Sequence, residues 1–188
     1  MKIVIGVAGA SGSALALETL RQLHNLGVET HLVVSRGGAL TACHELGADG
    51  PARFARLAAK VHAIDDLAAP IASGSFGADA MAIVPCSMRT LAAISIGLGD
   101  NLLTRAADVT LKERRRLVVV AREAPLTEAH LNAMLAVTRM GGIVAPPVPP
   151  FYAKPETLDD VVREIAARTV RWLGLDPGPA LTRWQGPS

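Results

Sequence analysis

The chain has 188 residues, 50% of them hydrophobic and 19% charged, which is a composition typical of one globular domain. Its formal net charge of +2 is too small for bulk electrostatics to indicate a nucleic-acid-binding protein. Because no apolar run approaches the ~20 residues of a membrane span and no secretory signal precedes the first strand-like run, we expect a cytoplasmic protein without membrane or nucleic-acid partners.

Short β-branched runs alternate with helical patterns along the chain, which is typical of βαβ units around a mostly parallel sheet. The patterns predict strands at residues 2–8, 30–35, 61–64, 80–85, 117–121 and 142–145. They predict helices at residues 13–26, 37–46, 89–96, 102–114, 128–140 and 158–173. We therefore expect one three-layer α/β domain over residues 1–173, followed by a tail at residues 174–188 that docks on a neighbouring subunit.

The loop GVAGASGS at residues 6–13 joins the first strand to the first helix, where backbone N–H groups and the helix dipole favour an anion. Its spacing does not match the dinucleotide pattern GxGxxG, and Ser35 stands where a dinucleotide site has an acid. Ser11 and Ser13, beside glycines, fit a compact phosphate monoester such as that of FMN. The alternative is a tight turn in which one of these two serines is an ordinary helix N-cap.

Ligands of parallel sheets bind beyond the carboxyl ends of the strands, and polar residues follow several predicted strands there. Cys86 is interpreted as a small buried residue, because no partner base is identifiable near it. Ser87 is interpreted as a helix N-cap that can also bind a ligand. Arg122 and Glu123 follow the next strand, where they either form an ion pair or take part in catalysis. These loops predict one site at a single edge of the sheet.

Cationic and aromatic residues later in the chain are candidates for the same site. Arg105 and Lys112 lie two turns apart on one face of a predicted helix, which serves either a ligand or a solvated surface. Tyr152 lies at residues 145–155, a stretch stiffened by prolines. Its sequence position fits either a packing role or a functional role. Arg168 lies at the edge of the apolar stripe of the last helix, from which it can reach an anion.

Metal binding is not predicted. The five histidines are scattered, and Cys43 and Cys86 fit neither a disulfide framework nor a CxxC pair. We expect two reduced thiols and no metal.

Six motifs, in order along nearly the whole chain, carry a resemblance to a known family. They are GASG at 9–12, IASGSF at 71–76, PCSMRTLAAI at 85–94, NLLTRAADVTLKERR at 101–115, RExPL at 122–126 and PPVPPFY at 146–152. With these motifs the chain resembles the flavin prenyltransferases of the UbiX/Pad1 type. The resemblance implies a flavodoxin-like or Rossmann-like subunit in a homododecamer of trimers, with FMN bound between subunits.

The activity implied by the resemblance joins a dimethylallyl group from dimethylallyl phosphate to N5 and C6 of reduced FMN, without a metal. Dimethylallyl pyrophosphate is left open as an alternative donor. The product, prenylated FMN, would be supplied to a UbiD-type decarboxylase, in many bacteria for ubiquinone biosynthesis.

The resemblance also implies roles for individual residues. FMN would be held by Gly9, Ala10, Ser11, Ser35, Ser87, Met88, Arg89, Thr90 and Arg122. The substrate would meet Tyr152, Arg168, Lys112, Arg105, Phe76 and Trp184. The catalytic set would be Glu123, which handles a proton, together with Ser11, Glu45 and Lys112. Gly37 and Gly38 are expected to loosen the helix that carries Glu45.

Two other classes of function remain open. An FMN-dependent cysteine decarboxylase has the same fold and FMN site, but its motif after the strand-end proline contains Asn and Met, whereas this chain has PCSMR at 85–89. A non-catalytic flavin carrier would need the FMN loops but neither Glu123 nor the set of Lys112, Tyr152 and Arg168. The joint presence of these residues favours an enzyme.

Overall fold

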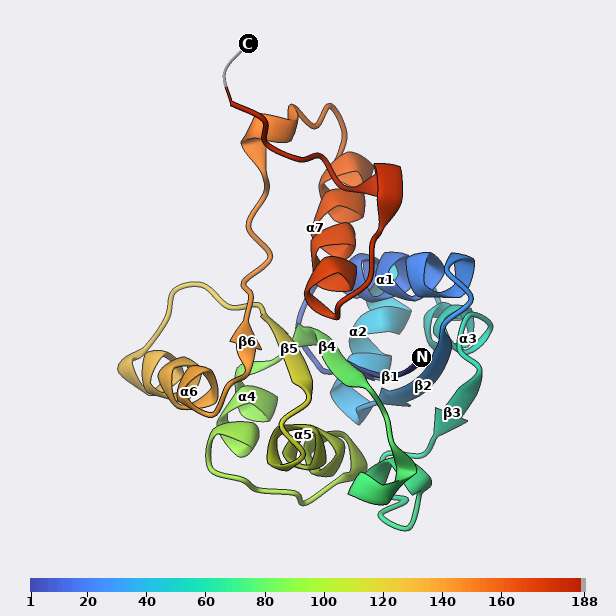
Figure 1. The fold of residues 1–188 in the computed structure, drawn as a ribbon, viewed down its shortest axis with the longest axis vertical. Helices are drawn as coiled ribbons and strands as arrows, with labels where there is room; N and C mark the ends of the chain where they lie inside the picture. Colours follow the sequence, from blue (N-terminus) through green and yellow to red (C-terminus); the bar gives the residue numbers. More distant parts are fainter. Residues whose placement is uncertain (187–188) are drawn as a thin grey trace.

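The computed structural model describes residues 1–186, in which a six-stranded parallel sheet lies between two layers of helices (Figure 1). The strands are β1 (Lys2–Val7), β2 (Glu29–Val34), β3 (Lys60–His62), β4 (Ala80–Cys86), β5 (Arg116–Ala121) and β6 (Ile143–Val144). Their order in the sheet is β3-β2-β1-β4-β5-β6. The helices are α1 (Ser13–Asn25), α2 (Arg36–Leu46), α3 (Gly50–Ala55), α4 (Met88–Ser95), α5 (Leu102–Lys112), α6 (Glu128–Arg139) and α7 (Leu158–Trp172). Short 3₁₀ turns are η1 (Pro70–Ala72), η2 (Gly74–Phe76), η3 (Phe151–Ala153) and η4 (Gly178–Ala180).

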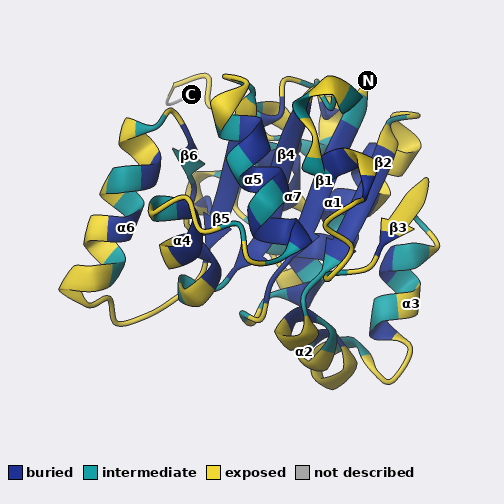
Figure 2. Cartoon of the chain, turned by 90° about the horizontal axis from the view of Figure 1, so that it is seen from below, coloured by how far each residue is buried: buried dark blue, intermediate teal, exposed yellow. Residues whose placement is uncertain are grey.

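The inner strands are buried on both faces, because alternate side chains of a strand point to opposite sides of the sheet. In β1, Ile3 and Ile5 belong to the core formed with α1, α2, α3 and α7, whereas Val4 belongs to the core formed with α4, α5 and α6. Figure 2 shows the inner strands β1, β2, β4 and β5 mainly in dark blue, between helices whose outer faces are exposed. The predicted three-layer α/β fold is confirmed.

The loops after β1 and β4 leave the sheet toward opposite layers. These two strands are neighbours in the sheet, yet β1 leads into α1 on one face and β4 leads into α4 on the other. Such a divergence opens a crevice at the carboxyl edge of the sheet, which is where ligands bind in folds of this kind. The backbone N–H of Ala8 donates to the carbonyl of Pro85 at 3.0 Å, and this hydrogen bond ties the two loops together.

Short polar side chains begin most of the helices, because a side-chain oxygen satisfies an N–H group that has no partner inside the helix. Ser35 Oγ accepts from the N–H of Gly38 at 3.0 Å at the start of α2. Ser87 Oγ accepts from the N–H of Thr90 at 3.4 Å at the start of α4. The corresponding N-caps of α5, α6 and α7 are Asn101, Thr127 and Thr157.

The structure corrects several predicted boundaries. Helix α3 was not predicted, since Gly50 followed by Pro51 resembles a turn; the proline instead occupies the first helical turn, where its missing N–H has no partner to lose. Helix α5 ends at Lys112 rather than at residue 114, and Arg114 adopts a left-handed conformation with φ of 57°. The edge strands β3 and β6 are shorter than predicted, with three and two residues.

The tail after α7 returns along that helix instead of extending away from it (Figure 1). It contains η4, and Arg183 Nη2 lies 3.1 Å from Asp176 Oδ1 within the tail. The docking of this tail on a neighbouring subunit stays a prediction. None of the helices in residues 1–186 is long and apolar enough to cross a bilayer.

Candidate functional site

A pocket of about 550 Å³, here called the edge pocket, opens at the carboxyl edge of the sheet. This volume falls within the ~300–1,000 Å³ that small-molecule sites occupy. Five of the residues predicted to hold FMN line it: Gly9, Ser35, Ser87, Arg89 and Thr90. The structure therefore brings the loops after β1, β2 and β4 to one cavity.

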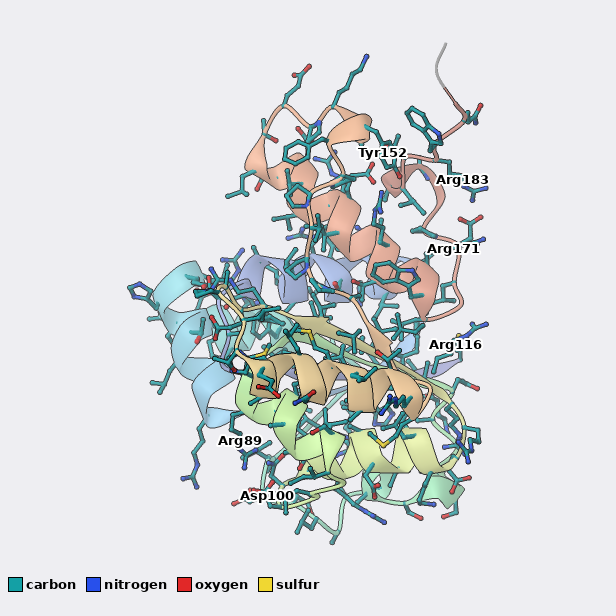
Figure 3. All side chains as sticks on the ribbon, turned by 90° about the vertical axis from the view of Figure 1, so that its left-hand side faces the viewer. Arg89, Asp100, Arg116, Tyr152, Arg171 and Arg183 are labelled. Carbon is teal, nitrogen blue, oxygen red and sulfur yellow. The ribbon has the colours of Figure 1, made fainter. Side chains whose placement is uncertain are left out.

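Other residues of the edge pocket were not predicted. These are Arg36, Gly37, Ile64, Asp65, Asp100, Asn101 and Leu103. The acidic Asp100 forms an ion pair with Arg89, and the two side chains are labelled together in Figure 3. Asn101 had a sequence signal, because Asn followed three residues later by Thr before an apolar run is a helix start, and that start faces the pocket.

Glycines allow the backbones of the first loop and of α2 to approach each other closely. A Cβ on Gly9 would lie 3.0 Å from backbone atoms of Gly37, and a Cβ on Gly38 would lie 2.5 Å from the carbonyl oxygen of Val7. The expectation that Gly37 and Gly38 loosen α2 is wrong, since both glycines lie inside the helix and let it pack against β1. A wall of the edge pocket therefore consists of backbone rather than side chains.

The N-terminus of α1 binds a carboxylate of its own chain. Oε2 of Glu45, in α2, accepts from the N–H of Ser13 at 2.7 Å and from the N–H of Gly12 at 3.1 Å. The N-cap residue is Gly12, with φ of 123°, so the alternative that Ser11 or Ser13 is the N-cap is wrong. Burial raises the pKa of Glu45, but the hydrogen bonds from Ser11, Ser13 and Gly12 outweigh it, and the net pKa lies below its usual value.

The four other predicted flavin-binding residues, Ala10, Ser11, Met88 and Arg122, do not line the edge pocket. The N–H of Ala10 donates to Ala8 O at 2.9 Å in the first loop, and the N–H of Arg122 donates to Cys86 O at 3.1 Å at the end of β5. Met88 packs partly buried against the core beneath α4. Ser11 is exposed beside Glu45.

Cys86 is fully buried, and this burial raises the pKa of its thiol far above the usual value. The interpretation of Cys86 as a buried small residue is therefore confirmed. Glu123 follows the carboxyl end of β5, is exposed, and accepts a hydrogen bond from the N–H of Ala124 at 3.0 Å.

A second cluster, the tyrosine group, consists of Tyr152, Arg168 and Trp184. Arg168 Nη2 donates to the hydroxyl of Tyr152, and its guanidinium carbon lies 5.4 Å from the centroid of the tyrosine ring. The ring of Trp184 meets that of Tyr152 edge-on, with centroids 5.5 Å apart. The Tyr152 hydroxyl also donates to the carbonyl of Thr182 at 3.3 Å. Arg168 Nε is buried without a hydrogen-bond partner in residues 1–186.

A third cluster, the α5 group, consists of Arg105, Lys112 and Phe76. Arg105 Nε donates to Ala72 O at 3.2 Å, which attaches α5 to the loop containing η1 and η2. Lys112 forms an ion pair with Glu113 beside the same loop. Phe76 packs edge-on against His31, with centroids 4.9 Å apart.

The tyrosine group and the edge pocket lie at opposite ends of the long axis of the subunit. Figure 3 shows Tyr152 near the upper end, with Arg89 and Asp100 near the lower end. Figure 1, in which the long axis is also vertical, has α5 at the bottom and the segment around η3 at the top. One subunit therefore does not bring the tyrosine group to the predicted flavin residues.

Metal ligands do not cluster in the described part of the chain. Residues 1–186 contain no group of three or more His, Cys, Asp and Glu side chains placed to hold an ion. The donors at the edge pocket are instead hydroxyls, backbone N–H groups and arginine, which suit an organic anion.

Comparison with known proteins first gives the class. A protein-family model described as Flavoprotein matches residues 1–170, which places the chain in the class of flavoproteins. The chain is 50% identical over 185 residues to the flavin prenyltransferase UbiX of Neisseria meningitidis serogroup B, across 98% of this chain and 97% of that relative. The chain belongs to the UbiX-type flavin prenyltransferase family.

Solved structures agree with this assignment. The crystal structure of AnUbiX (PadA1) in complex with FMN and dimethylallyl pyrophosphate has a TM-score of 0.95 at 48% identity, covering 100% of this chain and 98% of that one. A dodecameric FMN-dependent UbiX-like decarboxylase from Escherichia coli O157:H7 has a TM-score of 0.94 at 46% identity, covering 99% of this chain and 100% of that one. The FMN-dependent cysteine decarboxylase TvaF, at 16% identity and a TM-score of 0.61 over 89% of this chain and 98% of its own, is alike in fold alone.

Proposed function

We propose that this protein is a metal-independent flavin prenyltransferase that joins a dimethylallyl group from dimethylallyl phosphate to N5 and C6 of reduced FMN. The observation that carries the proposal is the 50% identity, over 98% of the chain, to a named flavin prenyltransferase. The geometry supports it in two places. The edge pocket has the donors and apolar walls that a flavin needs, and the tyrosine group has the donors that a phosphate needs.

The edge pocket fits FMN. Ser35, Ser87 and Arg89 offer donors to a phosphate and to the polar edge of the flavin ring, and Ile64 and Leu103 offer apolar contacts to its faces. The wall at Gly9 presents backbone to a ligand, because Gly9 and Gly37 approach each other too closely for a side chain. Bound in its reduced form, FMN supplies the nucleophilic positions at which the prenyl group is attached.

The donors of the tyrosine group would stabilise the leaving phosphate. When the allylic C–O bond breaks, negative charge grows on the phosphate oxygens, and donors that are already in position stabilise it without reorganisation. Arg168 and Tyr152 are in contact before any substrate is bound. Lys112 and Arg105 would add positive charge, and Trp184 and Phe76 would offer aromatic faces to the allylic cation.

An assembly of several copies would bring the separated clusters together. The tyrosine group and the edge pocket occupy different parts of one subunit, so a complete site needs residues from neighbouring copies. We expect a dodecamer built of trimers, and the Escherichia coli relative is named as dodecameric. The predicted tail at residues 174–188, which carries the exposed Trp184, would dock on a neighbouring subunit in that assembly.

Closing the new ring requires the loss of a proton from C6, and Glu123 is the proposed acceptor. Ser11 and Glu45, which lie beside each other at the first loop, would complete the catalytic set with Lys112. Prenylated FMN would leave the protein for a UbiD-type decarboxylase in the cytoplasm.

The test uses purified protein with reduced FMN and dimethylallyl phosphate, kept anaerobic and free of added metal. Mass spectrometry should detect a flavin that is heavier by one five-carbon unit, with release of one phosphate. A parallel reaction with dimethylallyl pyrophosphate distinguishes the two donors. Recovery of unmodified FMN from protein that demonstrably binds FMN, with either donor, would refute the proposal.

A further inference from the structure

Glu164 is a buried carboxylate in α7, 8% exposed, to which the proposed reaction gives no role. Its Oε1 accepts from the backbone N–H of Thr182 at 2.9 Å and from the Thr182 hydroxyl. Its Oε2 is buried and has no hydrogen-bond partner in residues 1–186. Because a buried carboxylate is costly unless it is hydrogen-bonded, Thr182 of the tail is the group that compensates for the burial of Glu164.

Thr182 also contacts the tyrosine group. Its carbonyl accepts from the Tyr152 hydroxyl, and two residues later Trp184 packs edge-on against the Tyr152 ring. Arg168, one helical turn after Glu164, donates to that same hydroxyl. Helix α7 therefore holds Tyr152 in two ways, directly through Arg168 and indirectly through Glu164 and the tail.

We propose that Glu164 is a positioning residue for the phosphate subsite, acting through the tail. By holding Thr182, Glu164 keeps the tail against Tyr152 and fixes the tyrosine hydroxyl beside Arg168, where the substrate phosphate would bind. This inference rests on the proposed function. Without the Glu164–Thr182 contact, Tyr152 loses its carbonyl acceptor and its aromatic neighbour, so phosphate binding must first order the ring.

A second contact of the tail provides a matched control. Arg183 Nη2 and Asp176 Oδ1 lie 3.1 Å apart, but their side chains are 59% and 62% exposed. Exposed ion pairs contribute little to stability, because water and salt screen them. The variant Asp176→Asn therefore disturbs the same tail without touching the buried contact.

The experiment measures equilibrium binding of dimethylallyl phosphate to protein loaded with oxidised FMN, which does not turn over. In Glu164→Leu, which removes both acceptor oxygens, we expect the Kd to rise about tenfold, the factor that corresponds to ~1.4 kcal/mol. Thr182→Val, on the exposed tail, keeps the backbone donor and should show a smaller rise, about threefold. Glu164→Gln retains an acceptor oxygen and should lie closest to the unmodified protein. Asp176→Asn should leave the Kd unchanged.

Two further readouts separate positioning from general damage. The Kd for FMN should stay the same in every variant, because none of the substituted residues lines the edge pocket. Trypsin should cleave after Arg183 several-fold faster in Glu164→Leu and Thr182→Val than in Asp176→Asn, since cleavage requires local release of the tail.

An unchanged Kd for dimethylallyl phosphate in both Glu164→Leu and Thr182→Val would overturn the inference, and so would an equal weakening of FMN binding. Faster cleavage with unchanged substrate binding would mean that the contact holds the tail without positioning Tyr152, which also overturns it. A third outcome is that the unmodified protein binds dimethylallyl phosphate more tightly than Glu164→Leu does but forms no prenylated flavin. This outcome would refute the proposed function and support the inference. Unmodified protein that does not bind dimethylallyl phosphate would refute both.

Discussion

Removal of the Glu45 side chain should destabilise the protein by about 1 kcal/mol at neutral pH. The reason is that this side chain, which belongs to α2, supplies the hydrogen-bond acceptor for the N-terminus of α1. The carboxylate accepts from the N–H groups of Gly12 and Ser13 at 2.7 to 3.2 Å, where Gly12 has no side chain to do so. Loss of a helix cap costs ~0.5–2 kcal/mol, and the exposure of Glu45 favours a value in the middle of that range.

The pKa of Glu45 also predicts how this loss of stability depends on pH. The pKa of Glu45 is lower in the folded protein than its ordinary value of 4.5, because the hydrogen bonds it accepts outweigh the opposing effect of burial. Its charge therefore contributes stability that is fully present above pH 4.5 and is lost as the pH falls through the folded pKa. Glu45→Ala should be less stable than the unmodified protein at pH 7, and the difference should shrink at acid pH.

The assay is urea unfolding of the FMN-free protein at one fixed protein concentration, since assembly makes apparent stability concentration-dependent. Glu45→Gln keeps an acceptor oxygen without the charge, so it should lose less stability than Glu45→Ala. Asp49→Asn serves as the control, because Asp49 and Arg56 form an ion pair 3.2 Å apart whose side chains are 62% and 64% exposed. This control should change stability by less than about 0.5 kcal/mol. A Glu45→Ala loss that is the same at acid and neutral pH would refute the capping argument.

Three other predictions follow from burial and from the assigned roles. A thiol reagent such as DTNB should modify exposed Cys43 in the folded protein and Cys86 only after denaturation; rapid modification of both would contradict the buried, high-pKa thiol. Phe54→Ala should lower the free energy of unfolding by about 3–5 kcal/mol, because Phe54 is fully buried, and a loss below about 1 kcal/mol in urea unfolding would contradict this. Glu123→Gln should slow formation of prenylated flavin more than it weakens FMN binding, whereas Ser11→Trp should abolish FMN retention on gel filtration; the reverse pattern would overturn both roles.

The layers and most helices were predictable because they depend on local pattern. Ile3, Val4 and Ile5 form a continuous apolar run, which is typical of a strand buried on both faces. Ser35 and Ser87 were predicted to bind FMN, and both line the edge pocket as caps at the starts of α2 and α4. Their position follows from topology, since helix starts after parallel strands share one edge of the sheet.

Contacts between residues far apart in the chain were not predictable. The cap of α1 comes from Glu45, which is 33 residues from Gly12, and no local spacing indicates that pairing. The same is true of Glu164 and Thr182, because the tail that carries Thr182 has neither helical nor strand periodicity. Helix α3 was missed for a different reason, as its glycine and proline have the composition of a turn.

The short edge strands limit how copies of this chain can associate. Strand β3 pairs over three residues, one of them Lys60, and β6 pairs over two before Pro146 and Pro147, which lack N–H groups. Neither edge offers a row of free backbone groups long enough for a strand of another molecule to add to the sheet. Contact between copies is thereby directed to side chains of helices and loops, such as the exposed Leu131 and Leu135 of α6. A protein with these edges can present many copies of itself to one another with little tendency toward fibrous aggregation.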